Sequence, residues 1–62
     1  MIFETEDGES VLIDAVVVVG QLQGNTGREF YQIHFSGGMH VSIKQSYKTR
    51  ASFIIDWNAT RA

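Results

Sequence analysis

Glycine supplies the turn signals in this chain, which contains six glycines and no proline. Asp7-Gly8 predicts a two-residue hairpin of type I′, because both central positions of that turn require positive φ. Gly24-Asn25-Thr26-Gly27 predicts a second hairpin, and Ser36-Gly37-Gly38 predicts a third. The segments between these turns are rich in Val, Ile, Phe and Tyr, which favour strands. The glycine pattern therefore predicts antiparallel strands joined by short turns.

The segment 10–22, SVLIDAVVVVGQL, is long for one straight strand. We expect a bend or bulge near Asp14, so that its first half pairs with residues 2–6 and its second half with residues 28–35. A bulge combined with strong twist lets a small sheet curl over its own core. In a regular strand, the side chains of Val17 and Val19 would share one face, opposite to the face of their neighbours.

The third turn predicts the register of its hairpin. A three-residue loop pairs Ile33 with Val41 and makes one face of the hairpin apolar. The other pairs on that face are Phe35–Met39 and Tyr31–Ile43. A two-residue loop would instead place Ile33 opposite Ser42, and burial of one face makes such a slip expensive. We therefore expect the three-residue loop.

The period of the apolar residues changes after Ile43, and the segment 44–60 reads as a helix. On a helical wheel its apolar residues cover an arc of about 200°, whereas one sheet contact requires about 100°. These residues are Tyr47, Ala51, Phe53, Ile54, Ile55 and Trp57. Either the sheet wraps around the helix or part of the helix faces a second subunit. The predicted fold is α+β, a strongly bent four-stranded antiparallel meander with one C-terminal helix packed on it, and residues 1–62 form a single small domain.

The size of the chain favours self-association. A domain of 62 residues buries only about 60% of the surface of its unfolded chain. The chain has no cysteine, so neither a disulfide nor a thiolate-bound metal can stabilise it, and we expect no cofactor. We predict a homodimer or higher oligomer. Aromatic residues are enriched at interfaces, and the predicted interface contains Phe53, Trp57, Val17 and Val19.

The register places His34 directly opposite His40, away from the apolar core. Two imidazoles at this spacing can share a metal ion, or repel each other when both become charged. Zinc sites generally use three or four protein ligands, and the chain has no other histidine. We expect the pair to be polar surface or interface residues, with a pH-sensitive pair and a metal at a subunit interface as alternatives. With no orienting acid near these histidines, we do not expect an enzyme.

Charge is distributed unevenly along the chain. Residues 1–27 carry five acidic residues and no Lys or Arg, for a net charge of −5, and residues 28–62 carry a net charge of +3, which together give the overall −2. Basic and aromatic side chains in the second part are candidates for contacts to single-stranded nucleic acid. These are Phe30, Lys44, Lys48 and Arg50. The acidic isoelectric point of about 5.5 argues against this alternative, because phosphate neutralisation provides most of such binding.

No membrane span or signal peptide is expected. The apolar run Val11–Val19 is interrupted by Asp14 and is much shorter than the roughly 20 residues that cross a bilayer. The sequence MIFETEDGES lacks the basic region that begins a signal peptide. We therefore expect a cytoplasmic protein.

The layout resembles that of small uncharacterised prokaryotic and phage proteins, in which hairpins with glycine turns precede a C-terminal amphipathic helix. The features that match are Asp7-Gly8, Asp14 before the valine run, Gly37-Gly38 before a strand, and the segment from Tyr47 to Trp57. The resemblance implies no activity and no site residues. We expect a small, non-enzymatic protein-interaction or regulatory protein, such as a phage or mobile-element factor that acts on a host protein, with nucleic-acid binding as the alternative.

Overall fold

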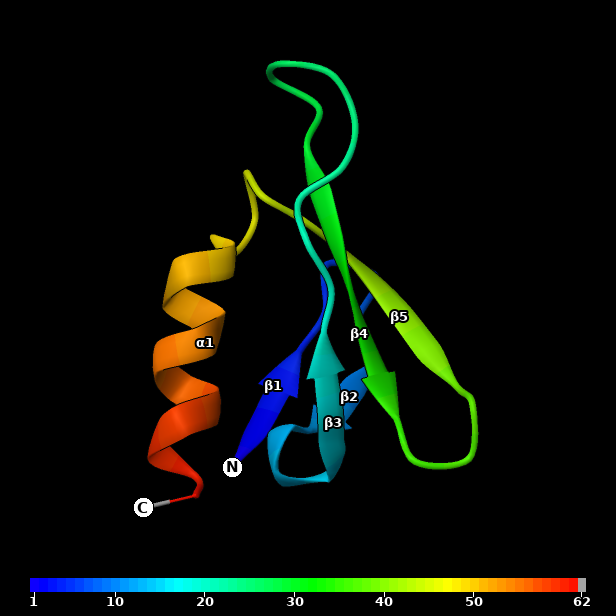
Figure 1. The fold of residues 1–62 in the computed structure, drawn as a ribbon, viewed down its shortest axis with the longest axis vertical. Helices are drawn as coiled ribbons and strands as arrows, with labels where there is room; N and C mark the ends of the chain where they lie inside the picture. The colour runs from blue at the N-terminus through cyan, green and yellow to red at the C-terminus, as the bar shows by residue number, and fades with distance from the viewer. Residues whose placement is uncertain (62) are drawn as a thin grey trace.

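The computed structural model describes residues 1–61. In chain order, its elements are β1 (Ile2–Glu4), β2 (Ser10–Leu12), the 3₁₀ turn η1 (Ile13–Ala15), β3 (Val16–Val19), β4 (Phe30–Phe35), β5 (His40–Lys44) and α1 (Arg50–Ala59) (Figure 1). The strands form an antiparallel β1–β2 hairpin and an antiparallel three-stranded sheet in the order β3-β4-β5. The predicted α+β class with antiparallel strands and a C-terminal helix is confirmed. Two separate sheets replace the predicted four-stranded meander.

The sheets are separate because the chain turns sharply at Asp14. The predicted bend lies there as the 3₁₀ turn η1, and Ile13 in this turn is buried. The strand before the turn pairs with β1 and the strand after it pairs with β4, as expected for the two halves. The N-terminal ammonium group lies 2.7 Å from Asp14 Oδ1 and lowers the pKa of that carboxyl group.

A bulge in β3 changes which valines face the core. Val16 pairs with Phe35 and Val18 pairs with His34, so Val17 is the extra residue. Val16 is buried and Val19 packs against the core, whereas Val17 and Val18 are both about half exposed, at 49% and 50%. The prediction that Val17 and Val19 share one face is therefore wrong, because a bulge interrupts the alternation of side chains.

The first turn has three residues instead of two. The Thr5 N–H donates to the Glu9 oxygen at 2.7 Å, and the Gly8 N–H donates to the Thr5 oxygen at 3.0 Å. Only Gly8 in this turn has positive φ, at 88°, so the predicted type I′ turn, which would need positive φ at Asp7 as well, is wrong. The third turn has the predicted three-residue loop, closed by the Phe35 N–H and the Met39 oxygen at 2.9 Å.

The core lies between the sheets and α1, and it consists of Ile13, Val16, Tyr31, Ile33, Ile43 and Phe53. Phe53 has no exposed surface, and its ring meets the rings of Phe3 and Tyr31 at centroid distances of 5.6 and 5.9 Å. The phenol group of Tyr31 donates to the Lys48 oxygen at 2.8 Å. These contacts attach the helix to both sheets.

The helix is shorter than the predicted segment 44–60. It begins at Arg50, because Thr49 is its N-cap and accepts a hydrogen bond from the Ser52 N–H at 3.2 Å. Tyr47 therefore lies outside the helix, where its hydroxyl group donates to the Glu4 oxygen at 2.8 Å. The arc is bounded by Phe53 and Ile55, so it stays at about 200° without Tyr47, but only the Phe53 border is buried and Ile55 is 68% exposed.

Candidate functional site

The two outer edges of the three-stranded sheet differ. At the β3 edge, side chains from the helical segment bind the backbone carbonyl groups. Trp57 Nε1 donates to the Val16 oxygen at 2.9 Å, and Arg61 Nη2 donates to the same oxygen at 3.2 Å. Arg50 Nε donates to the Gly20 oxygen at 2.7 Å. At this edge, side chains of the same chain therefore occupy the backbone acceptors of Val16, Val19 and Gly20.

The β5 edge has no such cover over most of its length. The Phe35 N–H donates to Met39 and the Gln45 N–H donates to Glu29, and hydrogen-bonded pairs alternate along an antiparallel ladder. The pairs His34–His40 and Gln32–Ser42 are therefore the non-hydrogen-bonded ones. It follows that the N–H and C=O groups of His40 and Ser42 point away from β4. Among residues 1–61, β5 has no strand neighbour except β4 and these outward backbone groups make no other hydrogen bond, and both residues are exposed.

One end of this open edge is bounded by the chain. The Lys44 oxygen accepts hydrogen bonds from the N–H groups of Tyr47 and Lys48, at 3.0 and 3.1 Å. Lys44 Nζ lies 3.2 Å from Glu6 Oε1 at the tip of the β1–β2 hairpin. A small cleft of about 90 Å³ separates the hairpin tip from the end of β5. The open edge therefore runs from His40 to Ser42 and ends in this cleft.

The histidine pair has the predicted register. His34 lies opposite His40, and their ring centroids are 5.7 Å apart with a tilt of 40° between the planes. His34 is partly buried and His40 is exposed. Across residues 1–61, no group of three or more His, Cys, Asp or Glu residues lies close enough together to hold a metal ion. The pair thus places one imidazole beside the open edge of β5.

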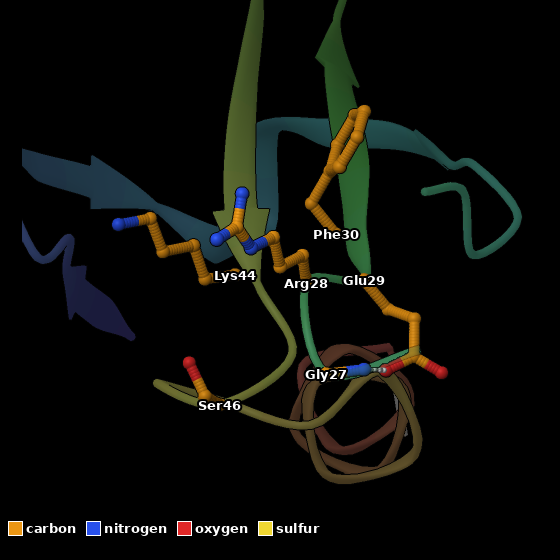
Figure 2. Close-up of a pocket in the computed structure, with 6 residues that line it drawn as sticks. All are labelled: Gly27, Arg28, Glu29, Phe30, Lys44 and Ser46. Carbon is orange, nitrogen blue, oxygen red and sulfur yellow. Dashed lines mark hydrogen bonds between the residues drawn. The ribbon is translucent and has the colours of Figure 1, made fainter. Parts of the chain in front are cut away.

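A second, larger cleft, which Lys44 also borders, lies at the end of the β4–β5 hairpin away from its turn and has a volume of about 480 Å³ (Figure 2). It is lined by Gly27, Arg28, Glu29, Phe30, Lys44 and Ser46. Figure 2 shows the side chains of Arg28 and Lys44 beside each other, with Glu29 directed away from both. Glu29 Oε1 accepts a hydrogen bond from the Gly27 N–H at 3.2 Å. The cleft is therefore bordered by two cations and by the Phe30 side chain, which points away from them (Figure 2).

The predicted nucleic-acid contacts are only partly brought together. Phe30 and Lys44 lie opposite each other, as expected. Lys48 is instead paired with Asp56 at 2.7 Å, and both side chains are largely covered. Arg50 binds the backbone at the β3 edge. Sequence reasoning missed Arg28, although it lies two residues before Phe30 and strand alternation places it on the same face.

The predicted interface residues also separate. Phe53 is fully buried in the core of its own chain, so it contributes no exposed surface. Trp57 is partly buried and donates to Val16, while the Arg61 guanidinium lies 4.4 Å above its ring. Val17 is exposed and Val19 packs against the core. Self-association stays a prediction, and the surface left for it contains Val17 and the 68% exposed side chain of Ile55.

Comparison with protein-family models, with curated proteins and with solved structures finds no match for this chain. Within residues 1–61, no helix has the length and apolar character needed to cross a membrane.

Proposed function

We propose that this chain is a small, non-catalytic protein-interaction module that binds an extended segment of another protein along β5. The observation that carries the proposal is the contrast between the two edges of the sheet. The β3 edge is closed by Arg50, Trp57 and Arg61, whereas the backbone groups of His40 and Ser42 have no partner within the described part of the chain.

An open edge of this kind is a template for strand addition. Peptides that add to a sheet edge gain affinity from main-chain hydrogen bonds and specificity from alternate side chains. Natural proteins usually protect such edges, because they also promote aggregation. Here side chains bind carbonyl groups at one edge, whereas at the other edge the N–H and C=O groups of His40 and Ser42 have no partner among residues 1–61.

Proline substitution tests this proposal. Ser42→Pro removes an N–H group that makes no bond to β4, and proline is tolerated on an edge strand when its N–H side faces outward. Ser42→Ala is the matched control, because it removes only the side-chain hydroxyl group and keeps the backbone N–H. We expect a partner captured from cell lysate to bind the parent chain and the alanine variant and to lose binding to the proline variant.

Hydrogen exchange provides a second measurement that does not depend on the proline variant folding. The amide protons of His40 and Ser42 should exchange rapidly in the free chain and become protected in the complex. Partner binding without protection of these two amides would refute strand addition.

Nucleic-acid binding is the alternative, and the cleft formed by Phe30, Arg28 and Lys44 is the observation that favours it. The affinity for nucleic acid should fall steeply as salt rises, because counterions are released when phosphates are neutralised. Capture of a partner from lysate distinguishes the two proposals. Nucleic-acid binding is supported over strand addition if nuclease and moderate salt abolish the capture and Ser42→Pro does not.

A further inference from the structure

We infer that the segment bound by β5 is acidic, with carboxylate side chains alternating with apolar ones. This inference rests on the proposed function, since it concerns the segment that adds to the open edge. It follows from the side chains on the two faces of β5 and from an ion pair that one of them makes.

The outer face of β5, which lies away from the core, carries no carboxylate. Its side chains are His40, Ser42 and Lys44, and the residues opposite them on β4 are His34, Gln32 and Phe30. Arg28 precedes the start of β4, and its side chain lies beside that of Lys44 (Figure 2). Directly opposed residues of an added strand lie with their Cβ atoms about 4.5–5.5 Å apart. A carboxylate on the outer face of the bound segment would therefore meet a cation or a hydrogen-bond donor.

On the inner face of β5, the bound segment would need apolar side chains, because the neighbouring residues of β5 are apolar. Ile43 is buried and Val41 is partly buried against the core, while Met39 is 70% exposed at the start of the edge. Side chains of an added strand on this face would extend the core past Val41 and cover Met39. Because strand side chains alternate, the same segment can be acidic on one face and apolar on the other.

The chain already places one of its own carboxylates on this surface. Glu6 Oε1 lies 3.2 Å from Lys44 Nζ, and the two side chains are 51% and 69% exposed. Glu6 comes from the β1–β2 hairpin and borders the small cleft at the end of β5. A carboxylate of the bound segment would therefore compete with Glu6 for Lys44.

A second copy of β5 is a poorer occupant by the same reasoning. Antiparallel pairing centred on Ser42 would place His40 of one copy opposite Lys44 of the other. Neither copy supplies a carboxylate on that face, so Lys44 of each copy would gain no ion pair from this pairing. Charge complementarity thus favours a different, acidic segment.

Titration with designed peptides tests the inference. The first probe is a seven-residue peptide with blocked termini that alternates glutamate and valine, and the second replaces each glutamate by lysine. Amide shifts of the ¹⁵N-labelled full chain report binding at β5. We expect the acidic peptide to shift the amides of His40 and Ser42 and to bind at least tenfold more tightly than the basic peptide.

Two variants locate the charge that recognises the peptide. Lys44→Gln should weaken binding of the acidic peptide about two- to fivefold, the range of an exposed ion pair. Glu6→Gln should strengthen it to a similar extent, because it frees Lys44. Glu9→Gln is the matched control, since it lies on the same hairpin, changes the net charge equally and should leave the affinity unchanged.

The possible failures are distinguishable. Equal binding of both peptides at β5, or equal effects of the Glu6 and Glu9 variants, would overturn acidic recognition and leave strand addition intact. Failure of the acidic peptide to shift the β5 amides would also overturn this inference. The proposed function itself fails only if Ser42→Pro retains the natural partner or if the partner leaves the His40 and Ser42 amides unprotected.

Discussion

Truncation of Phe53 should reveal how much of the stability of this fold depends on one helix residue. Its side chain has no exposed surface and contacts Phe3 and Tyr31, so it joins α1 to both sheets. A buried Phe→Ala change costs about 3–5 kcal/mol, through lost burial and a residual cavity. At about 0.05–0.15 kcal/mol per residue, a chain of this length has a total stability of roughly 3–9 kcal/mol.

Phe53→Ala should therefore remove about a third or more of the stability of the fold. Phe53→Leu keeps most of the apolar volume and should cost about 1–1.5 kcal/mol, which leaves a folded protein that can be measured. Ile55→Ala is the control on the same helix, because this side chain is 68% exposed, and it should change stability by less than about 0.5 kcal/mol. Urea unfolding followed by circular dichroism measures all three. A large loss for Ile55→Ala together with a small loss for Phe53→Leu would show that the opposite helix face is buried.

Four further outcomes are expected. Ile33→Ala should destabilise the fold by about 2–4 kcal/mol and Gln32→Ala by less than about 0.5 kcal/mol in urea melts, and reversed sensitivities would show a register slipped by one. Burial raises the pKa of Tyr31, so the free energy of unfolding should be independent of this group below about pH 10 and should fall as the pH rises above that. Melts between about pH 8 and 11.5 should show this fall for the parent chain and not for Tyr31→Phe. Replacing His34 and His40 by Gln should leave the fold intact, and Zn²⁺ should bind the parent chain only weakly; submicromolar affinity that disappears in the double variant would contradict this. Sedimentation at micromolar concentration should show an oligomer, and a folded monomer of 6.9 kDa would disprove self-association.

The parts of this fold that follow from the sequence are those set by neighbouring residues. The three-residue loop at Ser36–Gly38 and the pairing of Ile33 with Val41 follow from turn chemistry and from one uniformly apolar face, and both are confirmed. The bend near Asp14 was predicted for the same reason, because the segment around it is too long for one strand. The opposed pair of histidines follows directly from this register.

Other features depend on residues far apart in the chain, and only the tertiary structure decided them. The bulge at Val17 exposes two consecutive valines, and no local pattern indicates where an extra residue enters the strand. Arg50 lies 30 residues from Gly20 and Trp57 lies 41 residues from Val16, yet their side chains close the β3 edge. Local geometry therefore determined the turn and the register of the β4–β5 hairpin. Which sheet edge stays open was decided by long-range hydrogen bonds from the helix, because backbone groups are covered only when distant side chains come within bonding distance.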